Sequence, residues 1–160
     1  MIVLGIDPGT ARLGYGFIRK DGAKLIHLAH GCLETPKMMP QSERLSFLHR
    51  ALTELIAKHQ PELVGVEKLF FQKNVTNAMT VSEARGVALL ALQEANVVIA
   101  EYTPMQVKLA ATGYGGADKR QVQDMVKRLF LLKEIPKPDD AADAPAIAYC
   151  AAVSVPGKRR

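Results

Sequence analysis

The sequence predicts an α/β fold built on one five-stranded mixed sheet with helices packed against it. Two short apolar runs, Ile2–Ile6 and Leu63–Val66, are typical of strands that are covered on both faces. Between them, the dipeptide Asp21-Gly22 joins two longer strand-like segments and indicates a β-hairpin of type I′. Apolar residues then recur at helical spacing between the later strands, which indicates parallel strands joined by helical crossovers.

The elements follow in a regular order along the chain. Strands are expected over residues 2–6, 13–19, 23–33, 63–67 and 97–102, and helices over 42–59, 75–95, a short segment from 104, 118–132 and 139–152. Three helix starts carry N-capping signals, namely Ser42, Thr103 before Pro104, and Asp118 with Gln121. Asn96 is a C-capping signal at the end of the second helix. This order places antiparallel strands on one side of the sheet and parallel strands on the other.

The composition indicates one soluble domain with an anionic partner. The chain has 160 residues, enough for a single domain over 1–160 with a short basic tail from about residue 154. Its net charge of +5 favours a partner such as nucleic acid. Because no membrane span or secretory signal is found, we expect a cytoplasmic protein, with Cys32 and Cys150 as buried reduced thiols. His27 and His30 are three apart on one strand, so opposite faces are expected and a joint metal site is disfavoured.

Four acidic residues lie where a metal site is expected. Asp7 and Glu67 each end an apolar strand, and parallel neighbouring strands would bring both to one rim of the sheet. Asp140 and Asp143 share one face of the last helix, and the alanines around them let that helix lie close to the sheet. Such an oxygen-only site needs compensating positive charge. Mg²⁺ or Mn²⁺ supplies it, with two ions per site when a phosphodiester is bound.

Each acid also has a purely structural interpretation. Asp7 can start the turn at Pro8-Gly9, and Glu67 can pair with a neighbouring lysine. Asp140 and Asp143 can satisfy the free N–H groups and the dipole of a helix start. The repeated placement of an acid at a strand end, together with the pair at helical spacing, favours the metal site.

A set of motifs extends through nearly the whole chain and is specific in combination. It consists of Gly5–Gly9 with Gly14–Gly16, Glu67 with Phe70, Asn74, Ala84–Ala88, Tyr102–Pro104 with Val107 and Lys108, Gly113, Lys119 with Gln121–Val126, and Asp140–Ala144. The set resembles the RuvC-type Holliday junction resolvases, which belong to the RNase H-like (retroviral integrase) superfamily.

This resemblance implies an RNase H-like fold and a homodimer that nicks two opposed strands of a four-way DNA junction in recombination and repair. The products would carry 5′-phosphate and 3′-hydroxyl ends, and the branch-migration proteins RuvA and RuvB would be partners. By motif position, Lys108 and Lys119 would support DNA binding and catalysis, and Phe70 would stack on a base near the junction centre. The catalytic, metal-binding acids would be Asp7, Glu67, Asp140 and Asp143.

Further basic residues are expected to contact DNA phosphates, namely Lys73, Arg120 and Arg12. The helix over 75–95 is expected to form part of a two-fold interface. Pro145 stands where the resembling family more often has an aliphatic residue, so the last helix is expected to begin late or kink and to change the geometry of its two acids. Two other functions stay open, an RNA–DNA hybrid ribonuclease and a non-catalytic junction-binding module.

Overall fold

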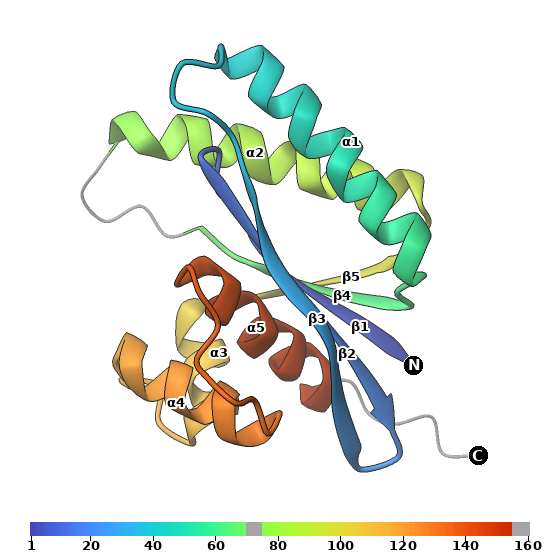
Figure 1. Ribbon diagram of the computed structural model, residues 1–160, viewed down its shortest axis with the longest axis vertical. Helices are drawn as coiled ribbons and strands as arrows, with labels where there is room; N and C mark the ends of the chain where they lie inside the picture. The colour runs from blue at the N-terminus through green and yellow to red at the C-terminus, as the bar shows by residue number, and fades with distance from the viewer. Residues whose placement is uncertain (70–74, 155–160) are drawn as a thin grey trace.

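One mixed sheet forms the centre of the molecule (Figure 1). The structure is a computed structural model that describes residues 1–69 and 75–154. Its strands are β1 (Ile2–Asp7), β2 (Arg12–Asp21), β3 (Lys24–Glu34), β4 (Leu63–Glu67) and β5 (Val98–Tyr102). They form a five-stranded sheet in the order β3-β2-β1-β4-β5. The pairs β1–β2 and β2–β3 are antiparallel, while β1–β4 and β4–β5 are parallel, so the predicted mixed sheet is confirmed.

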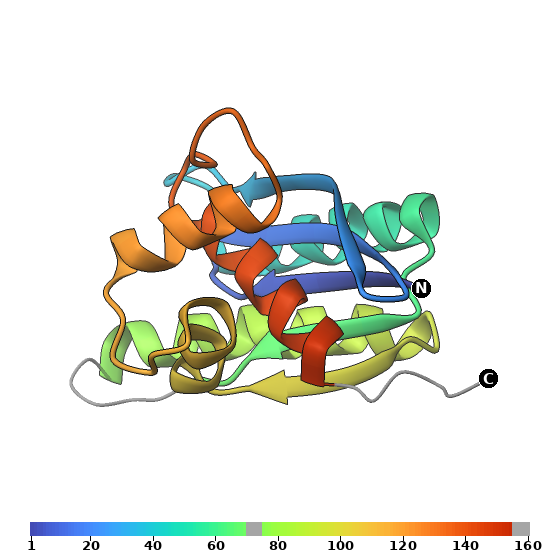
Figure 2. The same ribbon diagram turned by 90° about the horizontal axis from the view of Figure 1, so that it is seen from below.

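Helices cover both faces of this sheet (Figure 2). The helices α1 (Gln41–His59) and α2 (Val75–Glu94) share one apolar core with the sheet. A second core, on the opposite face, joins the sheet to α3 (Pro104–Thr112), α4 (Lys119–Leu129) and α5 (Asp140–Ser154). The expected alternation of strands and crossover helices is therefore present in the second half of the chain.

The alternation of side chains along the central strands decides which residues face which helices. On β1, Leu4 and Ile6 pack against α1 and α2, whereas Val3 belongs to the core beneath α5. Asp7 is an even number of residues from Val3 along β1, so its side chain faces the same side of the sheet. On β4, Val64 and Val66 face α1 and α2, whereas Leu63 and Glu67 face the α5 side. Both strand-end carboxylates therefore belong to the α5 side of the sheet, at the same end of two adjacent strands.

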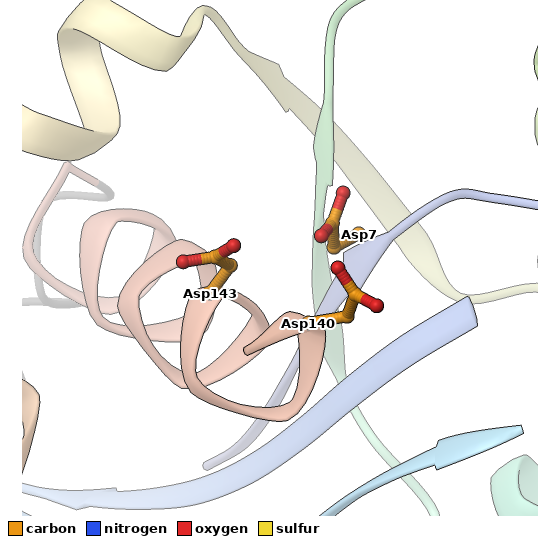
Figure 3. A group of neighbouring side chains, drawn as sticks. All are labelled: Asp7, Asp140 and Asp143. Atoms are coloured by element: carbon orange, nitrogen blue, oxygen red, sulfur yellow. The ribbon is translucent and has the colours of Figure 1, made fainter. Parts of the chain in front are cut away.

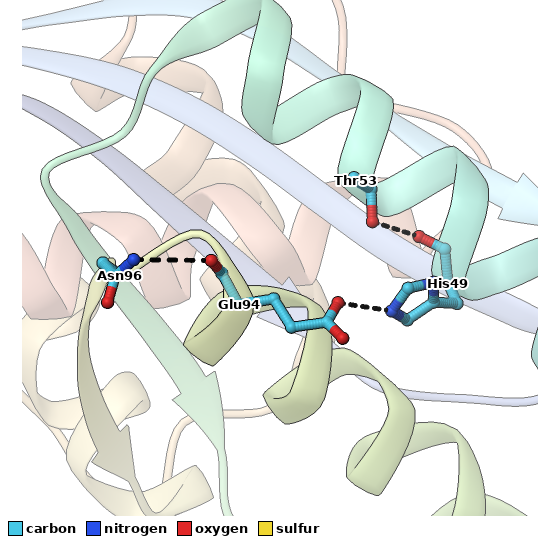
Figure 4. A network of polar contacts seen from close by, with 4 residues as sticks. All are labelled: His49, Thr53, Glu94 and Asn96. Atoms are coloured by element: carbon cyan, nitrogen blue, oxygen red, sulfur yellow. Dashed lines mark hydrogen bonds and ion pairs between the residues drawn. The ribbon is translucent and has the colours of Figure 1, made fainter.

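Polar contacts join α1 to the end of α2 (Figure 4). His49 Nε2 lies 2.9 Å from Glu94 Oε2, and the Thr53 hydroxyl donates to the main-chain oxygen of His49 at 2.8 Å. Asn96 Nδ2 donates to the main-chain oxygen of Glu94 at 3.5 Å. Asn96 has a φ of 55°, the left-handed conformation typical of a residue that ends a helix, so this predicted cap is confirmed.

The predicted starts of α3 and α4 are confirmed as reciprocal capping boxes. Thr103 Oγ1 accepts from the N–H of Gln106 at 3.1 Å, and Gln106 Oε1 accepts from the N–H of Thr103 at 2.8 Å. Asp118 and Gln121 form the same pair of bonds, each at 2.9 Å. These bonds satisfy orphan N–H groups at the starts of α3 and α4.

The predicted N-cap of α1 is wrong. α1 begins after Pro40, which has an extended ψ of 147° and no side-chain capping bond, so Ser42 lies inside the first turn. The proline fixes φ and starts the helix ahead of the serine. The ends of two other helices also differ from the prediction, because α4 stops at Leu129 and α5 continues to Ser154.

A β-bulge overturns the prediction for the two histidines on β3. The hairpin loop is Gly22-Ala23, one residue later than predicted, and only Gly22 of the two has a positive φ, at 59°, which excludes type I′. Farther along, the pairing skips Leu28, so the alternation of faces is reset. As a result His27 Nε2 lies 2.7 Å from His30 Nδ1 on the same face, rather than on opposite faces.

The two cysteines match their prediction only in part. Cys150 is buried in α5, but Cys32 is half-exposed because β3 is an edge strand of the sheet. Most of the predicted basic tail, residues 155–160, lies outside the described residues. Within the part of the chain that the structure describes, no helix is both long enough and apolar enough to cross a bilayer.

Candidate metal centre

Three carboxylates converge at one end of the sheet (Figure 3). Asp7 is the last residue of β1, and Asp140 and Asp143 lie in the first turn of α5. One oxygen from each carboxylate lies within 4.8 Å of the other two. Carboxylate oxygens grouped in this way are the ligands that Mg²⁺ and Mn²⁺ take. The structure thus brings three of the four predicted acids into one close group.

A row of glycines lets α5 lie almost against the sheet backbone. Gly16, Gly5 and Gly65 are directly paired across β2, β1 and β4. A Cβ added at Gly5 would lie 2.0 Å from the main-chain oxygen of Ala144 and 2.4 Å from the nitrogen of Ala148. No residue with a side chain fits there without moving the helix. The glycines on the sheet and the alanines on α5 therefore set the distance between Asp7 and the helix acids.

Two glycines of β2 let the first turns of α5 lie close to the sheet. A Cβ at Gly14 would lie 2.2 Å from the main-chain oxygen of Asp140 and 3.4 Å from the Cβ of Asp7. A Cβ at Gly16 would lie 2.8 Å from Cδ of Pro145, so the absence of a side chain leaves room for the proline ring. Pro145 lies inside α5, which begins at Asp140. The helix therefore does not begin late in spite of the proline, and both of its acids stay within reach of Asp7.

Glu67 lies beside this group. Among the described residues the close group has three members, and Glu67 is not one of them. Its charge nevertheless acts on Asp7, and it lines the same cavity as Asp143. Arg85 on α2 donates from Nε to the main-chain oxygen of Glu67 at 3.4 Å, and its Nη2 lies 2.7 Å from Glu101 Oε2. Arg85 therefore ties the end of β4 to β5 and α2.

Burial and mutual repulsion make the carboxylates hard to ionise together. Burial, followed by the charges of Glu67, Asp143 and Asp140, raises the pKa of Asp7 from 3.8 to about 8. Burial and then Asp143 raise the pKa of Glu67 from 4.5 to about 7. Burial also raises the pKa of Asp143, although Lys119 opposes the shift. Lys119 offsets only part of this negative charge, and a bound cation would provide more positive charge.

We expect the stability of the wild type in a metal chelator to fall as the pH rises. The folded-state pKa values of about 8 for Asp7 and about 7 for Glu67 lie above the ordinary values of 3.8 and 4.5. The folded state therefore holds protons that the unfolded chain has released. The contribution of these groups to folding stability is fully present below the pKa values of the unfolded chain. It is lost as the pH rises through the raised pKa values of the folded state. Each such group changes the free energy of unfolding by about 1.4 kcal/mol per pH unit.

Denaturant unfolding measured from about pH 5.5 to about pH 9 checks this expectation. Asp7→Asn removes one titrating group and should flatten the profile, and saturating Mg²⁺ should do the same for the wild type. Parallel profiles for wild type and variant would contradict the proposed protonation of Asp7.

Two of the lysines predicted to support DNA binding, Lys108 and Lys119, lie beside the carboxylates. Lys119 opens α4, and its Nζ lies 3.3 Å from Asp143 Oδ2 and 3.5 Å from Asp139 Oδ2. Lys108 on α3 lines, together with Lys119, Glu67 and Asp143, a cavity of about 240 Å³. The two lysines and the two carboxylates therefore face one cavity. A phosphate group there can contact the lysine ammonium groups while it lies beside the carboxylates.

The other predicted DNA contacts differ in their placement. Arg12 opens β2 and is exposed, with its Nε 3.5 Å from Glu34 Oε1. Arg120 is exposed on α4, next to Lys119 in the chain. Phe70 and Lys73 lie outside the described residues.

Sequence reasoning missed the residues that position the site through the backbone. The glycine row was not predicted, although glycines two apart within a strand pattern, at Gly14 and Gly16, indicate close approach of another backbone. Neither Arg85 nor Asp139 was predicted to contact site residues, because both contacts depend on the pairing of distant elements.

Known proteins match this chain over nearly its full length. The family model for crossover junction endodeoxyribonuclease RuvC matches residues 3–151. Proteins of that name from Rubrobacter xylanophilus and Chloroflexus aggregans are 54% and 52% identical, covering 96% and 100% of this chain and 86% and 98% of their own lengths. The structure of T. thermophilus RuvC in complex with Holliday junction substrate has a TM-score of 0.88 at 40% identity, covering 94% of this chain and 92% of that chain. These matches confirm the RNase H-like fold and the endonuclease prediction, and the chain belongs to the RuvC family of crossover junction endodeoxyribonucleases.

Proposed function

We propose that this chain resolves four-way DNA junctions, with Asp7, Glu67, Asp140 and Asp143 as its metal-binding, catalytic acids. The observation that carries the proposal is the convergence of three of these carboxylates within 4.8 Å in a protein with a net charge of +5. A positive body attracts a polyanion, and an acidic pocket accepts it only with a cation. The 40% identical relative in complex with a Holliday junction supports this substrate.

The residues present fit a divalent cation. The close group offers only carboxylate oxygens, and the pKa of Asp7, raised to about 8, reflects the negative charge around it. Asp7, Asp140 and Asp143 would hold Mg²⁺ or Mn²⁺, with Glu67 reaching the site from the neighbouring strand. When bound, such ions activate water and stabilise the leaving oxygen of a phosphodiester.

The lysines have a separate task at the substrate phosphate. Lys119 is already oriented by Asp143 and Asp139, and Lys108 lines the same cavity. Their ammonium groups would neutralise the phosphate as it approaches the carboxylates. Water attack on the phosphorus, with breakage of its bond to the 3′ oxygen, would leave the 5′-phosphate and 3′-hydroxyl ends expected from the family resemblance.

Symmetric cutting of a junction requires two copies of the chain, and α2 offers a surface for this purpose. Ala84 and Ala88 are buried within the protomer core, so that side of the helix is not available to a second copy. Met79 and Leu90 are 68% and 52% exposed, and their spacing of eleven residues places them on one side of the helix. We expect a dimer through this side of α2. The family resemblance extends the proposal to cooperation with RuvA and RuvB.

Sedimentation velocity at micromolar concentration is expected to show a dimer. Met79→Glu with Leu90→Glu should shift the population to monomer, since buried charge is costly in an apolar interface. A wild type that sediments only as a monomer would contradict the proposed interface.

The experiment that tests the function is a nicking assay on a labelled mobile four-way junction, with Mg²⁺ and Mn²⁺ supplied separately. Linear duplex DNA and an RNA–DNA hybrid of the same length serve as comparison substrates. Paired nicks in the junction alone are expected. Faster cutting of the hybrid would favour the ribonuclease alternative, and junction binding without cutting in either metal would favour the non-catalytic module.

A further inference from the structure

We propose that a second groove, which borders the acidic group at Asp140 whereas the lysine cavity borders it at Asp143, binds the backbone phosphates of the DNA strand being cut. This inference rests on the proposed function. We call it the Arg12 groove, and it has a volume of about 730 Å³. Its lining includes the charged and polar residues Arg12, Glu34, Lys37, Gln41, Arg44 and Asp140.

The acids separate the two cavities. Glu67 and Asp143 line the lysine cavity, whereas Asp140 lines the Arg12 groove. Oxygens of Asp7, Asp140 and Asp143 all lie within 4.8 Å of one another, so the one acidic group borders both cavities. An endonuclease cuts at an internal phosphate, so the strand must continue on both sides of the reacting atoms. The Arg12 groove provides that second path.

The walls of the groove are held in place by main-chain contacts. The hydroxyl of Thr35 donates to the main-chain oxygen of Thr10 at 2.7 Å, and the N–H of Thr35 donates to Ala11 O at 3.0 Å. Arg44 donates from Nε to Met39 O at 2.9 Å and from Nη2 to Lys37 O at 2.6 Å. The segment after β3 is thus fixed against α1 and the turn after β1, which gives a pre-organised surface.

The charges of the groove suit a polyanion. Arg12, Lys37 and Arg44 line it, and Lys37 and Arg12 are exposed to solvent. The groove also contains Glu34, whose Oε1 lies 3.5 Å from Arg12 Nε and reduces the attraction of that cation. A phosphate backbone, with a regular row of negative charges, can engage separated cations in this way.

The test measures junction affinity with matched charge variants. The parent is Asp7→Asn, in which hydrolysis does not consume the DNA, and binding to a fluorescent four-way junction is followed by anisotropy at several salt concentrations. The groove variant adds Arg12→Gln and Lys37→Gln. The control adds Lys24→Gln and Lys58→Gln, two exposed lysines at the hairpin and at the far end of α1 that change the net charge equally.

We expect the groove variant to bind the junction about tenfold more weakly, and the slope of log affinity against log salt to fall by about two, one for each lost phosphate contact. The control should keep the affinity of the parent within about twofold, as expected for cations that touch no phosphate. A further variant, Glu34→Gln, should bind the junction more tightly, because it removes the carboxylate that pairs with Arg12.

Three results would contradict DNA binding by the Arg12 groove. They are equal losses of junction affinity in the groove and control variants, unchanged affinity in both, and a loss of affinity in the groove variant without a change in its salt slope. Circular dichroism of each variant separates unfolding from lost contacts, and the conservative Arg12→Lys with Lys37→Arg should restore the salt slope. Failure of the proposed function is a different result, namely the absence of junction nicking by the wild type, and it is independent of the ranking of these variants.

Discussion

Asp7→Asn will reduce nicking of a four-way junction by about a thousandfold or more, while junction binding is retained. The variant keeps the shape of the side chain but removes one of the three carboxylates that converge within 4.8 Å. Loss of a metal ligand in such a site removes several kcal/mol of transition-state stabilisation, and each 1.4 kcal/mol is about a factor of ten in rate. Binding depends mainly on cations outside this group, and a weaker negative charge near the DNA does not oppose it.

Single-turnover nicking in Mg²⁺ or Mn²⁺, together with a binding titration, checks this result. Asp21→Asn is the matched control, because Asp21 is exposed at the far end of β2 and the chemical change is the same. The control should behave as wild type in both measurements. Nicking by Asp7→Asn within about tenfold of wild type would remove Asp7 from the catalytic group.

Gly5→Ala will be the most destabilising of the small substitutions, by about 3 kcal/mol or more. The added Cβ would stand 2.0 Å from Ala144 O and 2.4 Å from Ala148 N, which are main-chain atoms that cannot rotate away. The helix must move off the sheet, and the second apolar core, which includes Ile147, opens with it. For a chain of this size the midpoint of thermal unfolding should fall by roughly 6–12 °C. Nicking should fall too, since α5 carries two of the converging acids.

Gly22→Ala is the control for this substitution. Gly22 has a positive φ of 59° but nothing within 4 Å of an added Cβ, so the change tests backbone strain without a collision. It should cost only about 1–2 kcal/mol. Equal losses of stability at the two positions would mean that close packing of α5 is not what Gly5 provides.

Much of the fold is predictable from local patterns. The apolar run ending at Asp7, its repetition before Glu67, and the caps at Thr103 and Asp118 each depend on a few adjacent residues, and the structure reproduces them. The i, i+3 spacing of the helix acids likewise indicated one helical face, together with small residues that allow close packing.

Features that depend on pairing between distant segments could not be predicted in this way. The bulge at Leu28 reversed the expectation for His27 and His30, because strand alternation is inferred on the assumption of continuous register. Pro145 suggested a disturbed helix, but its partner is Gly16 on another strand, which leaves room for the ring. The groove beside Arg12 likewise depends on four separate segments, around residues 9–12, 34–44, 80–81 and 140, that meet only in the folded chain.

The converging carboxylates come from the first strand and the last helix of the fold. During synthesis, Asp7 leaves the ribosome long before its two helical partners are translated. A nascent chain that ends before α5 therefore lacks two of the three converging carboxylates. Docking of α5 over the glycine row is the step that completes the acidic group.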